Sequence, residues 1–509
     1  MIIDYIQLTD ESIYSSEWVF AEIEDRMLLA RLGTQEFLIS TRSVVEELHI
    51  IQYEVRKMND IHRHNIVGIA GVTESVYFKI FEIVSLQKQS LVSLDISETQ
   101  KELEAILIEA VRLGASDLHI TRNDILAKLE VRVNGLLLPM MQMPSSKCDE
   151  LVFVLYNVQA STRDTTWNRT IPQSANILYQ LNARSFRFRY AHFPIFGETA
   201  DCYHAVLRII PSGFSKGTVA NLNKLGISHE ELEDLKKILS NPYGAYIIAG
   251  TTGSGKSTTL KNLMEWLQIN RYADRGCFLT VEDPVEYQIY GAKQSSVVSV
   301  EGGGFHSAIK SALRRDPDVL MVGEIRDNIS ANALAGAVES GHYCFTTVHA
   351  GNIVSLLQRL SAMGITSDKL STPGFVAGLQ CQKLVPVICA DCRRSLELPF
   401  GGQMMTLYEQ REEGCEKCNY TGISGRQLVI EYMRPTYDEL AAISRQEWLQ
   451  VYVLWRNKRI PAPGLSEGFE IKEKVFAEVL RGRVCATWFS MEFGDVEKDN
   501  LEVILGKVQ

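Results

Sequence analysis

The sequence predicts an α/β protein whose C-terminal half is built on a parallel sheet with crossover helices. After Tyr243, short apolar runs of strand length alternate with helical segments, and a glycine-rich loop joins one such run to a helix. Apolar runs of this kind are typical of parallel strands that helices cover on both faces. The 509 residues also exceed what one compact core accommodates, so two to four domains are expected.

The composition limits the classes of partner and compartment. The hydrophobic fraction is 46%, and the formal net charge of -10 disfavours nucleic acid as a bulk partner. No apolar run approaches the roughly 18 residues that cross a bilayer. The segment from Met1 to Glu11 lacks the basic region of a signal peptide. We therefore expect a cytoplasmic protein that works at a membrane only through partners.

The pattern along the chain predicts five regions. Residues 1–95 carry no chemical signature and form an N-terminal domain of unknown role, and the polar, serine-rich segment from Gln89 to Glu102 predicts a linker. A helical pattern from Leu103, followed by strand-like runs, predicts a smaller α+β domain. The predicted bounds are 96–222 for this domain, 223–240 for a second linker, 241–436 for the α/β domain and 437–509 for a mainly helical C-terminal region.

The glycine-rich loop from Gly250 to Ser257 fits the phosphate-binding pattern G-x-x-x-x-G-K-[ST]. It follows the apolar run Tyr246 to Ala249 and opens a helix, which is the context that this motif requires. Glycines let backbone N–H groups turn toward phosphates, and a helix N-terminus favours anions. Lys256 would reach the β- and γ-phosphates, and the Ser257 hydroxyl would ligate Mg²⁺. The alternative is a chance glycine-rich turn. The predicted nucleotide-binding residues are Gly250, Thr251, Thr252, Gly253, Ser254, Gly255, Lys256, Ser257 and Thr258.

Polar groups follow three further strand-like runs at the point where each run ends. Glu282, Glu324 and His349 stand at these positions. Because ligands bind at the carboxyl ends of parallel strands, these groups can meet at one edge of the sheet, facing the loop. Hydrolysis needs a carboxylate that positions or activates water and another that helps to hold Mg²⁺, and the division of these roles between Glu282 and Glu324 stays open. Separately, Glu282 could belong to a helix-capping turn and His349 could be structural.

Two C-x-x-C pairs predict a metal site. Each pair can aim two thiolates at one ion, and the segment between the pairs is close to zinc-ribbon length. Four protein ligands leave no open position, so the predicted role is structural. A redox pair is the alternative, which the second pair disfavours. The predicted zinc ligands are Cys389, Cys392, Cys415 and Cys418.

These motifs resemble the secretion ATPase family that powers type II secretion and type IV pilus assembly and retraction. Four boxes of that family are present in family order. The matching segments are Gly250–Ser257 for the Walker A box, Glu282–Glu286 for the Asp box, Leu313–Asp327 for the Walker B region and Gly341–Asn352 for the His box. The tetracysteine element resembles that of the assembly and secretion members, since the retraction members usually lack it.

The region before the P-loop resembles the family's preceding domain. Ala115–Ile120 is similar to its Ala-Ser-Asp-x-His opening, although Asn134 replaces the usual Asp of a later turn and Glu130 stands where assembly-type members often carry Arg. The resemblance implies that Arg189 and Arg208 reach the nucleotide and act in catalysis. The alternative is that both arginines are ordinary strand residues facing solvent.

The resemblance also implies a fold, cofactors and partners. The fold is a RecA-like motor domain with a zinc-ribbon-like insertion at about 381–427, preceded by the smaller α+β domain, which is PAS-like and senses nucleotide, and by the extra N-terminal domain. The expected cofactors are ATP, Mg²⁺ and structural Zn²⁺. The expected assembly is a homo-hexamer on the inner face of the bacterial inner membrane, where a platform protein passes the work to pilin-like subunits. Nucleic acid is not expected as a partner.

Three functions remain open at this stage. The first is an ATPase that assembles a type IV pilus, which the departures in the small domain and the divergent N-terminus favour. The second is a type II secretion ATPase that assembles a pseudopilus. The third, from another class, is an ATP-regulated scaffold with little turnover.

Overall fold

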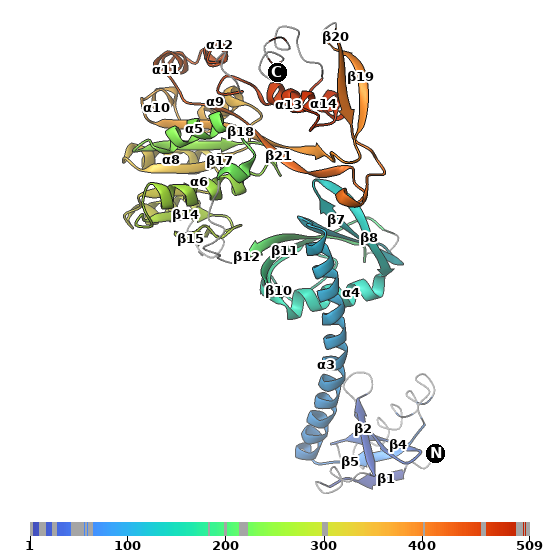
Figure 1. The fold of residues 1–509 in the computed structure, drawn as a ribbon. Coiled ribbons are helices and arrows are strands. Elements are labelled where there is room, and N and C mark those ends of the chain that lie inside the picture. The colour runs from blue at the N-terminus through green and yellow to red at the C-terminus, as the bar shows by residue number, and fades with distance from the viewer. Residues whose placement is uncertain are drawn as a thin grey trace. The chain divides into compact units, whose positions relative to one another are not determined.

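The computed structural model describes most of the chain and divides it into two compact units. Unit 1 comprises residues 1–106 and 149–158, and unit 2 comprises residues 107–148 and 159–509. Figure 1 shows the fold, coloured along the chain. The described residues are 4–9, 17–22, 28–41, 55, 59, 65–181, 184–197, 201–212, 222–297, 304–400, 403–459, 465–494, 502 and 504.

Unit 1 contains a small mixed sheet and most of a long helix. Its strands are β1 (Asp4–Gln7), β2 (Trp18–Glu22), β3 (Leu28–Leu32), β4 (Gln35–Ser40) and β5 (Ile66–Gly71). Among the described residues they form one sheet in the order β1-β5-β4-β3-β2. Phe37, Ala70 and Ile80 belong to its core.

The segment from Gln89 to Glu102, predicted as a linker from its loop-like composition, is helical and not irregular, because it lies inside helix α3 (Glu74–Arg112). The segment is rich in serine, which suggested a linker, but it contains neither glycine nor proline. Without one of these residues nothing in the sequence forces the helix to end. Within the part of the chain that the structure describes, no helix is both long and apolar enough to cross a membrane.

Unit 2 begins with an antiparallel sheet. Its strands are β6 (Asp117–Arg122), β7 (Leu126–Val133), β8 (Leu136–Pro144), β9 (Ala160–Arg163), β10 (Gln173–Leu181), β11 (Arg184–Pro194) and β12 (Tyr203–Ser212). Their order is β8-β7-β6-β12-β11-β10-β9 in the described ranges. The chain between β8 and β9 forms helix α4 (Ser145–Phe153) and the π-helical turn η2 (Val154–Val158), of which residues 149–158 belong to unit 1. We call this sheet the small-domain sheet.

A tight turn explains why Asn134 can replace the aspartate of the family pattern. β7 and β8 are joined by two residues, Asn134 and Gly135, whose φ angles are 51° and 91°. Two-residue hairpin turns of this kind need positive φ at both positions, and Asn tolerates it as Asp does. The substitution therefore keeps the turn and removes one negative charge.

The second sheet of unit 2 is the parallel sheet that the sequence predicts. Its strands are β13 (Gly244–Ala249), β14 (Phe278–Glu282), β15 (Ala292–Ser296), β16 (Val319–Val322), β17 (Tyr343–Val348), β18 (Val376–Ile388) and β21 (Ile423–Met433). Their order in the described residues is β15-β14-β16-β17-β13-β18-β21, and β21 alone among these runs antiparallel to its neighbour. The 3-10 turn η4 (Leu222–Leu225) and helix α5 (His229–Leu239) precede the first of these strands. The helices between the strands are α6 (Lys256–Asn270), α7 (Phe305–Leu313), α8 (Asn328–Glu339), α9 (Ile353–Ala362) and α10 (Ser367–Leu370).

We call this sheet of β13–β18 and β21 the motor sheet. Helices cover both of its faces (Figure 1). Alternate residues of β13 show the two layers, since Ile247 packs in one core with residues of α8 and α9 and Ile248 packs in another with residues of α5 and α6. β13, β17, β16 and β14 are neighbours. The segments that leave their carboxyl ends therefore emerge at the same edge of the sheet.

Two long strands, β18 and β21, extend beyond the sheet at this same edge, because β18 runs parallel to β13 and continues past its carboxyl end. β18 and β21 continue as an antiparallel ribbon toward the four cysteines, between which lies the hairpin β19 (Arg394–Phe400) and β20 (Gln403–Glu409), followed by the 3-10 turn η6 (Glu416–Cys418). The C-terminal region is helical, as α11 (Tyr437–Ser444), α12 (Trp448–Arg456), α13 (Ile471–Leu480) and α14 (Ala486–Phe493). Several of its side chains, among them Trp455 and Phe476, belong to the core of the motor sheet.

Candidate functional site

The glycine-rich loop lies between β13 and α6. Gly250 has a φ of 156°, and a Cβ atom there would lie 2.4 Å from Ser254 Oγ, so a larger residue would collide with the loop itself. Gly255, with a φ of 86°, is the N-cap of α6. The Lys256 ammonium donates to the carbonyl oxygens of Gly250, at 2.7 Å, and Thr251, at 3.2 Å. Burial lowers the pKa of Lys256, while the carboxylates of Glu324 and Glu286 oppose this effect.

A cavity of about 1020 Å³ opens beside this loop. Residues from Thr252 to Thr258 line it, and so do all three polar groups that the sequence placed at strand ends, Glu282, Glu324 and His349. The cavity also receives Arg208 from the small-domain sheet. The structure therefore brings together, on one cavity, groups that lie far apart in the sequence.

Glu324 and His349 are in direct contact. The Nε2 atom of His349 lies 3.0 Å from Oε1 of Glu324, and Nε of Arg326 donates to Oε2 of Glu324 at 2.7 Å. Arg326 also lies 3.7 Å from a carboxylate oxygen of Asp283. Glu324 follows β16 and His349 follows β17, so the parallel register of these neighbouring strands sets the contact. Both oxygens of Glu324 are thereby oriented.

Glu282, the last residue of β14, is more deeply buried than Glu324. It is 6% exposed, and Oε1 accepts from the Thr280 hydroxyl at 2.6 Å and from the Gln294 amide at 3.0 Å. Burial raises the pKa of Glu282, although these two hydrogen bonds lower it in part. Glu282 is thus the carboxylate of this cavity whose basicity the surroundings increase.

A row of charged residues crosses the small-domain sheet. Arg189, Arg208, Asp117 and Arg132 are neighbours on β11, β12, β6 and β7. Arg208 Nε donates to Asp117 at 3.2 Å, and its Nη1 lies 3.6 Å from Glu286, the last residue of the predicted Asp box. Arg132 and Arg208 line the cavity, whereas Arg189 is not among its lining residues in the described part of unit 2.

Sequence reasoning did not single out three residues that line this cavity. Arg326 lies inside the Leu313–Asp327 segment, Tyr287 follows the acidic cluster, and Arg426 follows the second cysteine pair. Burial raises the pKa of Tyr287, while a hydrogen bond with Thr258 lowers it in part. Arg426 lies within β21 opposite Pro386 of β18, and this strand pairing, which the sequence does not show, brings it to the cavity.

The four cysteines predicted as zinc ligands form a cluster. Their Sγ atoms all lie within 4.8 Å of one another. The Sγ atoms of Cys389 and Cys415 are 3.8 Å apart, and those of Cys392 and Cys418 are 3.9 Å apart. Zinc–thiolate bonds of about 2.3 Å in a tetrahedron place sulfurs about 3.8 Å apart, so the cluster fits this ion.

Backbone amides prepare one of these thiols for a cation. The N–H groups of Cys415 and Gly422 donate to Cys418 Sγ at 3.1 and 3.2 Å. Although burial raises it, these amides lower the pKa of the Cys418 thiol to about 6. Amide donors to sulfur favour the thiolate form that binds metals.

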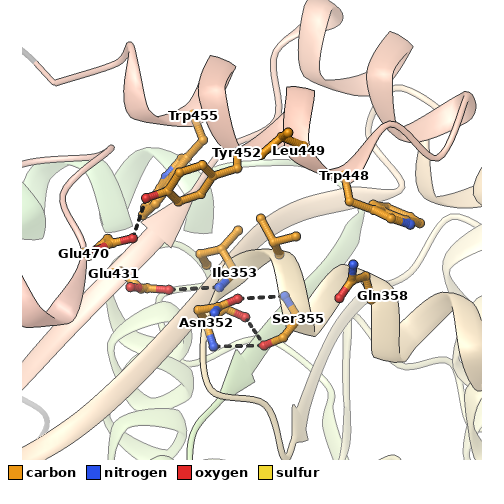
Figure 2. Close-up of a pocket in the computed structure, with 11 residues that line it drawn as sticks. Asn352, Ile353, Ser355, Gln358, Glu431, Trp448, Leu449, Tyr452, Trp455 and Glu470 are labelled. Carbon is orange, nitrogen blue, oxygen red and sulfur yellow. Dashed lines mark hydrogen bonds between the residues drawn. The ribbon is translucent and has the colours of Figure 1, made fainter. Parts of the chain in front are cut away.

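A second cavity, of about 340 Å³, lies between α9 and α12. Figure 2 shows Glu431 at its base, with one oxygen accepting from the backbone N–H of Ile353 at 2.9 Å. The other oxygen accepts from the N–H of Ile471 at 3.1 Å. Glu431 therefore links the first turn of α9, just after His349, to the first turn of the C-terminal helix α13. Burial raises the pKa of Glu431 to about 7, although the two amides lower it in part.

Named relatives have sequences similar to most of this chain. The type II secretion system ATPase E of Vibrio cholerae is 29% identical over 79% of this chain and 80% of its own length. The type IV pilus assembly ATPase PilB of Thermus thermophilus is 30% identical over 68% of this chain, which covers only 38% of that protein. The crystal structure of the Legionella pneumophila ATPase DotB matches 76% of this chain and 93% of its own, with a TM-score of 0.53 at 19% identity, a likeness that concerns the fold alone.

These similarities confirm the predicted fold class, a RecA-like P-loop domain with a zinc-ribbon-like insertion that is preceded by a smaller α+β domain and an N-terminal domain. Residues 93–476, most of the chain, match the family model described as "Type II/IV secretion system protein". The chain therefore belongs to the type II/IV secretion system protein family.

Proposed function

We propose that this protein hydrolyses ATP in the cavity beside the P-loop and that hydrolysis powers the assembly of a pilin-like filament. The observation that carries the proposal is the convergence of Lys256, Glu282, Glu324 and His349 on one cavity. A phosphate-binding loop alone serves many reactions. The two carboxylates at the same sheet edge can supply the base or water-positioning group and the Mg²⁺ ligand that hydrolysis of the terminal phosphate needs.

The P-loop residues would bind the phosphates. The backbone N–H groups at the start of α6 and the ammonium of Lys256 supply positive charge at the place where negative charge develops. Lys256 presently donates to Gly250 and Thr251, so it exchanges these carbonyl oxygens for phosphate oxygens when ATP binds. The loop thus keeps its lysine hydrogen-bonded in both states.

The two glutamates divide the remaining work. Glu282 is the better general base, because its burial raises its pKa toward the working pH. The negative charge of Glu324 acts on Lys256 and raises the pKa of that lysine. With the Ser257 hydroxyl, Glu324 would hold Mg²⁺, an ion that neutralises phosphate charge when it is bound. His349 orients Glu324. Arg208 would stabilise charge on the transferred phosphoryl group from the small-domain side.

Assembly and cellular place form part of the same proposal. The protein would act as a homo-hexamer at the cytoplasmic face of the inner membrane, joined to it through a platform protein that transmits the motion to pilin-like subunits. The support is the resemblance of the four boxes to secretion ATPases and the family membership of residues 93–476. The tetracysteine cluster would hold a structural Zn²⁺.

We propose a type IV pilus as the filament. Support comes from Glu130 and Asn134, which depart from the charges of the family pattern in the small domain. A type II secretion pseudopilus is the second candidate, which the length of the match with the Vibrio cholerae secretion ATPase favours. A deletion strain separates them: loss of surface pili with normal exoprotein release supports the pilus. Normal pili with a retained exoprotein would show the secretion role instead.

The enzyme activity is tested with purified protein. Assembled wild-type protein is expected to release phosphate from ATP in a Mg²⁺-dependent reaction, and Lys256→Ala is expected to abolish the release. The control is Lys237→Ala, a lysine on α5 that pairs only with Asp234 at the surface among its described contacts. Assembled rings in which wild type and Lys256→Ala release phosphate equally slowly would identify a scaffold that binds ATP without turning it over.

A further inference from the structure

A chain of buried hydrogen bonds lies beneath the P-loop. The amide Nε2 of Gln382 donates to the carbonyl oxygen of Ser254 at 2.7 Å, and Nε2 of Gln380 donates to Oε1 of Gln382 at 2.9 Å. The Tyr246 hydroxyl donates to Oε1 of Gln380. All four residues are at most 3% exposed. Buried polar networks of this kind are strong only when every member is satisfied.

The direction of this chain has one solution. A backbone carbonyl can only accept, so Gln382 must turn its NH₂ group toward Ser254. Its oxygen then faces Gln380, which must in turn present its NH₂ group and leave its own oxygen for Tyr246. Burial raises the pKa of Tyr246 well above its ordinary value, so the phenol remains a donor. The Ser254 carbonyl at one end and the Tyr246 hydroxyl at the other therefore fix the orientation of both glutamine amides.

The bond to Ser254 also sets the direction of the next N–H group. The carbonyl of Ser254 and the N–H of Gly255 belong to one planar trans peptide, in which they point in opposite directions. Holding the carbonyl against β18 therefore turns the Gly255 N–H away from β18. Gly255 lines the cavity and begins α6, where unpaired N–H groups bind anions.

We propose that Gln382 is a positioning residue for phosphate binding. Its amide holds the Ser254–Gly255 peptide in the orientation that offers the Gly255 N–H to the phosphates. Gln382 does not itself line the cavity among the described residues and acts only through Ser254. The inference rests on the proposed nucleotide function of the P-loop.

Gln382→Glu separates positioning from mere packing, because the two side chains have nearly the same shape. As a carboxylate, the new side chain would set an oxygen against the Ser254 carbonyl and repel it. As a neutral acid, it can donate to that carbonyl as the amide does. The variant should therefore regain nucleotide affinity as the pH falls through the raised pKa expected of a buried glutamate.

Other groups near the chain do not supply this pH dependence. Tyr246, on β13, stays protonated, and Cys381, between the two glutamines, has a pKa that burial raises well above its ordinary value. Lys256 on the loop and Glu431 on β21, which pairs with Cys381, are present in every variant. The matched control is Gln427→Glu, the same change on β21, at a residue that contacts Gly226 instead of the P-loop.

The experiment measures the dissociation constant of Mg²⁺–ADP for the full chain at about pH 6 and about pH 8.5, together with the melting temperature without nucleotide. Gln382→Glu is expected to bind about tenfold more weakly than wild type at the higher pH and within about threefold at the lower one. Gln427→Glu should match wild type at both. Affinity equal to wild type at the higher pH, or an equal loss at both, overturns the proposal.

A second variant keeps the test decisive if Gln382→Glu does not fold. Gln382→Met has a similar length and no donor, so it should lose affinity about tenfold at both pH values. Unchanged affinity in this variant, with only a lower melting temperature, would show that Gln382 merely packs. If wild type itself binds no Mg²⁺–ADP, the proposed nucleotide function fails, and this inference fails with it.

Discussion

The Nε2 atom of His349 lies 3.0 Å from a carboxylate oxygen of Glu324. This contact joins the ends of two neighbouring strands, β16 and β17, at the cavity. Because Arg326 holds the other oxygen of Glu324, the carboxylate keeps one orientation. Glu324 is therefore oriented by two cationic or polar side chains, whereas Glu282 is buried against Thr280 and Gln294, and we expect the two glutamates to act differently.

Glu282→Gln and Glu324→Gln should fail in different ways. Loss of the base in Glu282→Gln is expected to lower kcat at least about 100-fold while Mg²⁺–ADP still binds within about threefold of wild type. Glu324→Gln should also raise the Mg²⁺ concentration needed for half-maximal rate, because it removes a charge from the ion's surroundings. Steady-state rates over a Mg²⁺ series measure both. An unchanged Mg²⁺ requirement in Glu324→Gln would contradict the assignment.

The sequence was most informative where one strand end determines the position of one residue. The P-loop, Glu282, Glu324 and His349 could be located because each follows an apolar strand, and parallel strands bring their carboxyl ends to one edge. Gln380 and Gln382 could not be recognised, because nothing in a sequence shows which buried carbonyl an amide will meet. The serine-rich part of α3 was misjudged from composition, where the absence of glycine and proline was the better guide.

The two predicted arginines show a further limit. Arg189 and Arg208 are paired on adjacent strands and point to the same face of the small-domain sheet, so the sequence pattern treats them alike. Only the packing of unit 2 shows that Arg208 lies at the cavity, against Glu286. Their separation follows from tertiary structure and gives a direct test.

Arg208→Ala is expected to lower kcat by tenfold or more, whereas Arg189→Ala should stay within about threefold of wild type. Arg208 is half exposed, so its removal should change the melting temperature little. ATPase rates of the assembled protein at saturating ATP provide the comparison, with Arg208→Lys as a variant that keeps the charge. Equal losses in both alanine variants would return Arg189 to the catalytic group.

The tetracysteine cluster should contain about one zinc ion per chain in purified protein. Cys418→Ser is expected to lose the metal and to lower the melting temperature, because a structural zinc contributes directly to the stability of the fold. Cys277→Ser is the matched control, since Cys277 lies outside the cluster and contacts Arg315. Metal analysis by mass spectrometry and thermal unfolding check both variants. A well-folded wild type without zinc would rule out the site.

Glu431 should make stability depend on pH. Its pKa is raised by burial to about 7, from an ordinary value of 4.5, so the folded state favours the protonated acid. The contribution is fully present below about pH 4.5 and is lost as the pH rises through about 7, amounting to at most about 3 kcal/mol. Glu431→Gln cannot ionise, so the difference in unfolding free energy between wild type and this variant should shrink as the pH rises. Denaturant unfolding at about pH 5.5 and about pH 8 measures it, with Glu412→Gln, an exposed glutamate, as the control. A difference that is the same at both pH values would mean that the amides of Ile353 and Ile471 keep Glu431 ionised throughout, because hydrogen bonds from two helix N-termini then outweigh its burial.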